Sequence, residues 1–341
     1  MSEAPANVSA TTAQPRAPAA PLPSWSIWAF AFGYFAAYAP YAALPKFLST
    51  GGGEGLSLLP VSTIASVATM VVYIFATGLH RYAGRVRVFG MNLPMPGRWT
   101  ALSGLASAAI VMTTTLAYTF DGVSIVFMML LLRGGVLVIA PIVDAITGRS
   151  VRWQSWAGLV LSLSSLVVAF LSRASFELTA LAAIDVGIYL FAYLIRLRLM
   201  SRLAKSQDRN VTLRYFVEDQ LVTTPAAVLF LSIVALLPGS AADQVRSGFA
   251  MFGGHPHLAA TVLIGVLSAG TGVFGGLVLL DPREATFTVP VNRASSILAG
   301  VVASASLALL GITRPPGVHE LIGAGLLVAA IVVLAIGGKK P

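Results

Sequence analysis

The chain of 341 residues contains no cysteine and little charge. The absence of cysteine excludes disulfides, thiolate metal ligands and cysteine nucleophiles. Only 10% of the residues are Asp, Glu, Lys or Arg, whereas soluble domains carry about 25%. Hydrophobic residues make up 57% of the chain, and the mean hydropathy is +0.84. This composition predicts an integral membrane protein.

Long apolar windows recur along the whole chain, and none alternates with period two. Backbone groups in lipid need internal partners, so such windows predict helices rather than strands. We therefore predict an all-α integral membrane protein with ten transmembrane helices, at 25–44, 58–79, 99–118, 121–146, 153–172, 176–203, 213–237, 256–280, 284–310 and 317–338.

The segment 1–24 lacks long apolar runs and is rich in Ala, Pro, Ser and Thr. It has neither a basic n-region nor an apolar core, so we do not expect a signal peptide. Its composition is typical of a disordered segment, and we expect a cytoplasmic tail.

The formal net charge of +9 is unevenly distributed. If the N-terminus is inside and the helices alternate, 16 of the 22 Lys and Arg residues fall on the inner side and four on the outer side. This bias orients a membrane protein and does not indicate nucleic-acid binding. We expect cytoplasmic termini in a bacterial inner (plasma) membrane, with lipid headgroups as partners of the basic loops.

The helices divide into two sets, which give two predicted repeats at 25–172 and 173–338. Five helices per half is an odd number, so the halves would insert in opposite orientations, as in many secondary transporters. Arg133 and Arg293 fall in the fourth helix of each half, roughly 18 and 14 Å deep at 1.5 Å per residue. Inverted repeats place their substrate site near this midplane.

Buried arginines are costly, at roughly 2.5–3.5 kcal/mol each on insertion scales. Each guanidinium matches carboxylate or phosphate oxygens through a planar fork, and the competing explanation is an ion pair with a neighbouring acid. Asp185 is the clearly deep acid, while Asp144 falls near an inner helix end. One deep acid cannot neutralise Arg133 and Arg293, which favours an anionic ligand. Asp185 would either hold an arginine or act as a protonatable coupling group.

Other polar residues are weaker candidates. Asp219 and Gln220 lie near the start of a helix, where they either form a solvated N-terminus or recognise hydrogen-bond donors of a ligand. Tyr34, Tyr38 and Tyr118 could line a polar path or make ordinary interhelical hydrogen bonds.

Three segments resemble the drug/metabolite transporter superfamily, in particular its nucleotide-sugar and triose-phosphate branch. The stretch LLRGGVLVIAPIVDAITGRSVRWQSWAGL resembles the segment from the fourth to the fifth helix of that family, through Arg133, Gly148, Arg149, Gln154, Trp156 and Gly158. TVPVNRASSILAG resembles the Asn-Lys motif of the ninth helix, with Asn292 and Arg293 in those positions. VEDQLVTTP resembles a seventh-helix motif, with Asp219, Gln220, Thr223 and Pro225 at the matching positions. The resemblance implies that the basic residues contact a substrate phosphate and that Asp219 and Gln220 help to recognise its distal part.

The expected function is therefore a secondary transporter, favouring exchange, of an organic anion such as a sugar phosphate or nucleotide sugar. Exchange is favoured because no phosphate-binding GxxxxGK[ST] motif for nucleotide hydrolysis occurs. One alternative is an exporter of neutral or amphipathic metabolites, amino acids or drugs in which the arginines are only structural. Another is an intramembrane enzyme acting on lipid-linked substrates, but no His and carboxylate cluster has metal spacing. We expect no cofactor and no metal, and no feature indicates an oligomeric state.

Overall fold

The computed structural model describes residues 26–50, 55–88, 91–117, 125–171, 180–205, 208–312, 315 and 318–337. Tyr118, one of the predicted site residues, lies outside these residues.

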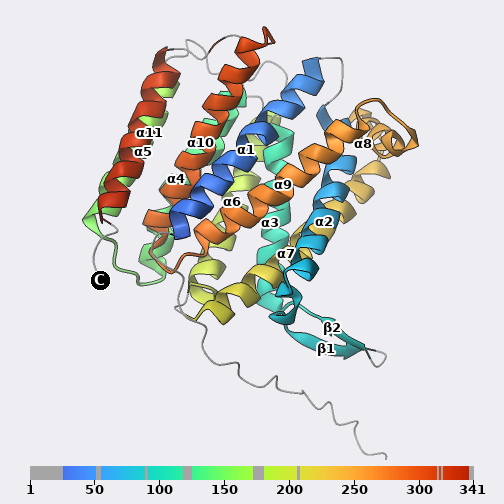
Figure 1. Ribbon diagram of the computed structural model, residues 1–341, viewed down its shortest axis with the longest axis horizontal. Coiled ribbons are helices and arrows are strands. Elements are labelled where there is room, and N and C mark those ends of the chain that lie inside the picture. Colours follow the sequence, from blue (N-terminus) through green and yellow to red (C-terminus); the bar gives the residue numbers. More distant parts are fainter. Residues whose placement is uncertain are drawn as a thin grey trace, which may run out of the picture.

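Helices dominate the described part of the chain, which confirms the predicted helical class (Figure 1). The α-helices are α1 (Ser26–Thr50), α2 (Leu59–Ala76), α3 (Arg98–Ala117), α4 (Ile125–Ile146), α5 (Trp153–Leu171), α6 (Ala180–Leu203), α7 (Arg209–Ala235), α8 (Ser240–Ala250), α9 (Leu258–Leu279), α10 (Ala285–Leu309) and α11 (Val318–Gly337). Short 3-10 helices cover Gly55–Leu58, Leu79–Arg81 and Met251–Gly253.

Five stretches in the described residues are long and apolar enough to cross a membrane: Ser26–Leu48, Leu56–Ala76, Arg209–Ala235, Leu258–Leu279 and Ala285–Leu309. The outward faces of the helices carry large apolar side chains, including Phe32, Phe191 and Leu309. Several charged side chains, in contrast, lie buried within the bundle, among them Arg133, Arg293 and Asp185. Apolar helices of this kind are compatible with an integral membrane protein.

Two elements were not predicted from the apolar windows. Arg85–Val88 (β1) and Met91–Pro94 (β2) form an antiparallel hairpin, with Val88 opposite Met91. The hairpin projects from one end of the bundle (Figure 1). The hairpin falls in a basic segment that was used only to predict membrane orientation. Its sequence RVRV alternates polar and apolar residues, as a strand with one buried face does. The second element, α8, has 11 residues, too few to span a membrane.

The helix packing follows a regular scheme. Helix α1 packs against α9 and α10, and α6 packs against α3 and α4. Helix α2 contacts α9 and α7, and α7 also contacts α3. Helices α5 and α11 lie side by side at one edge (Figure 1), and α4 contacts α10. Glycines allow some of these approaches: a Cβ on Gly135 of α4 would lie 2.4 Å from the Leu190 side chain of α6.

A buried carboxylate joins α4 to α10. Asp144, fully buried near the end of α4, accepts hydrogen bonds from the backbone nitrogens of Ala285 at 2.9 Å and Thr286 at 2.7 Å. The Thr286 hydroxyl donates a third bond to it at 2.6 Å. These backbone groups begin α10, where helix amides lack intrahelical acceptors. Asp144 therefore fixes the start of the helix that carries Arg293.

Candidate functional site

Arg293 lies on α10 with 1% of its surface exposed. Its Nη1 donates to the Tyr189 hydroxyl at 3.2 Å, and its Nη2 donates to the Tyr193 hydroxyl at 2.6 Å. The guanidinium carbon lies 4.8 Å from the centroid of the Tyr193 ring, so a cation–π contact accompanies the hydrogen bond. Both tyrosines belong to α6, one helical turn apart, which places their hydroxyls on the same face.

Arg133 has the same kind of environment. It lies on α4 with 3% of its surface exposed, and its Nη1 donates to the Tyr34 hydroxyl of α1 at 3.3 Å. Its Nη2 donates to the Tyr38 hydroxyl, and the guanidinium carbon lies 5.0 Å from the Tyr38 ring centroid. The structure thus brings together three of the predicted residues, Arg133, Tyr34 and Tyr38.

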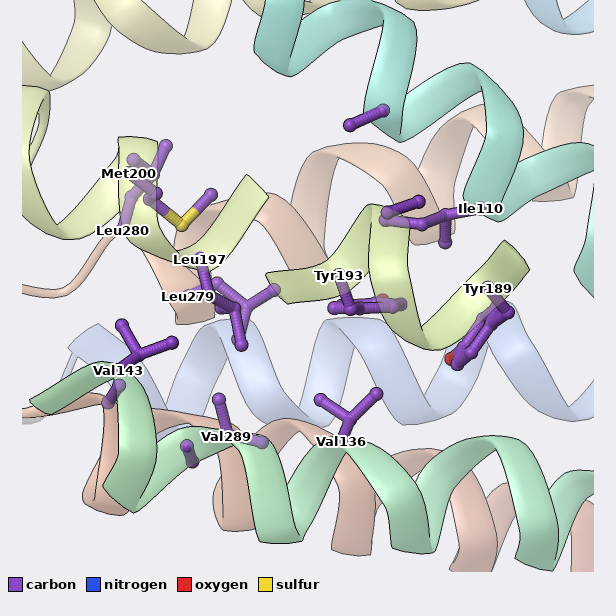
Figure 2. Packing of buried hydrophobic residues seen from close by; sticks show 14 of the residues in the cluster. Ile110, Val136, Val143, Tyr189, Tyr193, Leu197, Met200, Leu279, Leu280 and Val289 are labelled. Atoms are coloured by element: carbon purple, nitrogen blue, oxygen red, sulfur yellow. The ribbon is translucent and has the colours of Figure 1, made fainter. Parts of the chain in front are cut away.

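Sequence reasoning missed Tyr189 and Tyr193. The signal was available: Tyr34–Tyr38 reads YFAAY and Tyr189–Tyr193 reads YLFAY, a shared Y-x-x-A-Y pattern in the first helix of each predicted half. In Figure 2, Tyr193 lies opposite Val136 of α4, and Tyr189 lies one helical turn away on α6.

The hydrogen-bonding pattern leaves donors in excess around Arg293. A tyrosine oxygen that accepts from an arginine still carries its own proton as a donor. In the described part of the chain, neither the Tyr189 nor the Tyr193 hydroxyl has an acceptor, and Arg293 makes no ion pair with a carboxylate. The Nε of Arg293 is also buried without a partner there. The site therefore suits a ligand that supplies acceptor oxygens and negative charge.

The two arginine sites belong to one region. Helix α10 packs against both α1 and α4, and Arg133 and Tyr34 lie close enough to act electrostatically on Arg293. Two like charges in one buried region repel each other unless a counter-charge is present. A single anion placed between them would relieve this repulsion.

Asn292 lies beside this region and has an open acceptor. Its Nδ2 donates to the Gly275 carbonyl of α9 at 3.1 Å, while its buried Oδ1 has no partner among the described residues. Gly275 also permits Tyr34 to approach, since a Cβ there would lie 2.8 Å from the tyrosine ring. Asn292 is thus positioned next to Tyr34, with one oxygen available to a ligand donor.

Asp219 is engaged by protein groups. It lies on α7 and accepts from the Ser103 hydroxyl at 2.7 Å and from the Ser107 hydroxyl at 3.2 Å. Arg196 of α6 forms an ion pair with it at 3.3 Å. Arg196 is buried, with 9% exposed, and was not among the predicted site residues. It lies on the same face of α6 as Tyr193, three residues further along.

Two neighbours of Asp219 have different environments. Gln220 is buried and faces α9, where a Cβ on Gly272 would lie 3.9 Å from its Oε1. Glu218 is also buried, so none of these three adjacent residues belongs to a solvated helix N-terminus. It accepts from the amides of Gly84 and Gly97, both at 3.0 Å, and thereby holds the two ends of the hairpin segment against α7.

Asp185 lies apart from these networks. It is 3% exposed on α6, and neither carboxylate oxygen has a hydrogen-bond partner among the described residues. It therefore holds neither arginine in this structure. In the same part of the chain, no group of three or more His, Asp or Glu side chains is arranged to hold a metal ion.

Comparison with known proteins identifies a fold but no family. No family model matches the chain, and no curated protein does. A solved structure described as "Crystal structure of protein" is similar in fold, with a TM-score of 0.56 and 15% sequence identity. The match covers 92% of this chain and 98% of that one. A similar helical fold therefore occurs in another protein of similar length.

Proposed function

We propose that the protein is a secondary transporter built from two inverted five-helix repeats, 25–172 and 173–338. The packing scheme supports this division. If α1 to α5 correspond to α6, α7, α9, α10 and α11, then the contacts of α1 with α9 and α10 correspond to those of α6 with α3 and α4. The contact of α2 with α9 likewise corresponds to that of α7 with α3.

The tyrosine–arginine contacts follow the same correspondence. In each proposed repeat, the first helix supplies a tyrosine pair to an arginine on the fourth helix. The separation in sequence is 95 residues from Tyr38 to Arg133 and 100 residues from Tyr193 to Arg293. Such a repeated contact is expected when a duplicated unit keeps its binding geometry, and inverted repeats bring both copies to the midplane.

The substrate we propose is an organic anion, such as a sugar phosphate or nucleotide sugar. The observation that carries this proposal is the fully buried Arg293, which is bonded to two tyrosine hydroxyls and not to a carboxylate. Its charge calls for an anionic partner, and guanidinium forks bind phosphate and carboxylate oxygens bidentately. The tyrosine protons add further donors for the same oxygens.

The other site residues have subsidiary roles in this proposal. Asn292 and Tyr118 orient the anion, and Asp219 and Gln220 recognise its distal part. Transport occurs by alternating access across a bacterial plasma membrane, with cytoplasmic termini, and exchange is the mode favoured by the lack of a GxxxxGK[ST] motif for nucleotide hydrolysis. No catalytic step and no cofactor are part of the proposal.

Counterflow in proteoliposomes tests this function. The panel contains sugar phosphates, nucleoside monophosphates, nucleotide sugars, amino acids and cationic drugs. We expect exchange of a phosphorylated compound, and its loss in Arg133→Ala and Arg293→Ala. Arg202→Ala, at an exposed position near the end of α6, serves as the control. Exchange of neutral or cationic compounds alone, unaffected by the two alanine variants, would support the rival exporter and overturn the proposal.

A further inference from the structure

Asp185 is the sixth residue of α6, so it lies about 8 Å from the first residue of the helix at 1.5 Å per residue. In the proposed topology this is the outer end. Asp185 precedes Tyr189 by one turn and therefore shares its face of the helix. Both carboxylate oxygens are inaccessible to solvent and have no hydrogen-bond donor among the described residues.

Other buried acids in the described part of the chain differ sharply from Asp185. Asp144 receives three hydrogen bonds at the start of α10. Asp219 receives bonds from two serines and Arg196, and Glu218 receives two backbone amides. Glu284 accepts from Arg152 at 2.9 Å and from Ser155 at 2.6 Å. These donors stabilise the ionised form of a carboxylate, and Asp185 lacks them.

The helices packed against α6 offer few charges that could compensate Asp185. In α3 the charged residue is Arg98, the first residue of the helix, which lies at the inner end in the proposed topology and so away from Asp185. In α7 the charged and titratable residues all lie in the first half of the helix: Arg209, Arg214, Tyr215, Glu218 and Asp219. Helix α4 contributes Arg133 and Asp144, which are engaged by tyrosines and by α10. On α6 itself, Tyr189, Tyr193 and Arg196 point to the networks described above, and Arg198 and Arg202 lie beyond them.

We infer that Asp185 is a proton-binding site that couples transport to a proton gradient. In the conformation described here the carboxylate has taken up one proton and is a neutral carboxyl, because a buried ionised carboxylate without donors is strongly disfavoured. The proton is released when the outer end of α6 meets water. Protonation of Asp185 is reversible: its carboxylate and one proton combine to form a neutral carboxyl group.

The sign of the coupling follows from charge, and this part rests on the proposed function. An anion bound near Arg293 would repel an ionised Asp185, which lies one turn before Tyr189 on α6. Anion binding therefore favours the protonated form of Asp185. Linkage is reciprocal, and protonation therefore favours anion binding by the same factor. The anion and the proton therefore travel in the same direction, so the carrier performs net proton-driven transport in addition to exchange.

Infrared spectroscopy of the full chain in lipid tests the proton site without a substrate. We expect the carbonyl band of a protonated carboxyl at neutral pH, where an exposed aspartate is ionised. Asp185→Asn removes this band, and Asp185→Glu retains it at a shifted frequency. Asp243→Asn, at an exposed acid of α8, is the control and leaves the band unchanged. A band that persists in Asp185→Asn, or is absent from the wild type, overturns the assignment.

Proteoliposomes with a clamped membrane potential test the coupling, using radiolabelled glucose 6-phosphate as the probe. An acidic exterior drives accumulation by the wild type, by up to about tenfold per pH unit for one proton per anion. In Asp185→Asn the ratio of uptake with and without the gradient falls to unity. Wild-type exchange that ignores the gradient refutes the coupling and leaves anion transport standing. No exchange of any phosphorylated compound refutes the proposed function, while the infrared band still decides the proton site.

Discussion

Arg293 and Tyr193 contact each other in two ways, through a 2.6 Å hydrogen bond to the hydroxyl and a guanidinium carbon 4.8 Å from the ring centroid. The ring fixes where the guanidinium lies, and the hydroxyl fixes how it is turned. Arg133 repeats both contacts with Tyr38. The hydroxyl and the ring of each tyrosine therefore make separate contacts with the arginine. Replacing tyrosine by phenylalanine removes the hydroxyl contact alone.

Tyr193→Phe keeps the ring and removes the hydroxyl. Hydrogen bonds to charged groups contribute about 1.5–3 kcal/mol, so we expect anion affinity to fall by one to two orders of magnitude. Tyr38→Phe should act in the same direction. The measurement is the half-saturating concentration in counterflow, and Tyr73→Phe on α2 is the control. An unchanged affinity in both variants would mean that the hydroxyls do not orient the arginines for a ligand.

The buried pair of Arg196 and Asp219 should matter for stability. Asp219→Asn leaves a buried guanidinium without its carboxylate, a change that typically costs about 3–5 kcal/mol. The exposed pair of Arg246 and Asp243 is the matched control, because surface pairs contribute at most about 1 kcal/mol. Thermal unfolding in detergent compares Asp219→Asn with Asp243→Asn. Equal melting temperatures for the two variants would argue against a tightly paired Arg196.

Close helix packing can be tested at Gly265 of α9. A Cβ at this position would lie 2.3 Å from the Ser62 carbonyl oxygen of α2, so Gly265→Ala forces the helices apart. Overpacking of this kind costs about 1–3 kcal/mol. Gly187→Ala on α6 meets nothing within 4 Å and is the control. It should be neutral or stabilise the protein by up to about 1 kcal/mol, because alanine favours a helix. A melting temperature unchanged in Gly265→Ala would contradict the tight contact between α2 and α9.

Stability should also depend on pH through Lys205, which follows the end of α6. Burial lowers the pKa of Lys205 to about 7, and its Nζ donates to the Arg283 carbonyl and the Thr288 hydroxyl. Unfolding restores an ordinary lysine pKa near 10.4. Between these values the unfolded chain binds the extra proton, so stability rises with pH from about 7 to about 10.

Lys205→Met should remove this component of the pH dependence, with Lys46→Met as a comparison at another lysine. The measurement is the melting temperature in detergent across this pH range. A wild-type stability that falls with rising pH, or an identical slope in Lys205→Met, would show that the lysine does not titrate as described.

Hydropathy predicted where helices lie, because burial in lipid demands continuous apolar sequence. Helix ends were less accurate: α7 begins at Arg209 rather than at 213, since Asp208 caps it by accepting from the Asn210 amide at 2.8 Å. The cap allows the helix to begin with polar residues, and a window of apolar sequence leaves such residues out. The hairpin was missed for a related reason, because four-residue strands are shorter than any such window.

The candidate site was predictable in its charges but not in its contacts. Arg133 and Arg293 stand out because lone charges in apolar runs are costly. Their tyrosine partners lie about 100 residues away in sequence, and local pattern carries no information on such pairings. Arg196 was not predicted as a site residue because it begins the basic run 196–202, which was interpreted as a signal of topology. Only the fold shows that this arginine faces Asp219.

The link from Asp144 to the first residues of α10 has a consequence for motion. In the proposed scheme α4 and α10 come from different repeats, yet three hydrogen bonds on one buried carboxylate tie them together at the same end. The end of α4 and the start of α10 are therefore held together by the Asp144 carboxylate. In the proposed transport cycle these two helix ends should therefore move together, although they belong to different repeats.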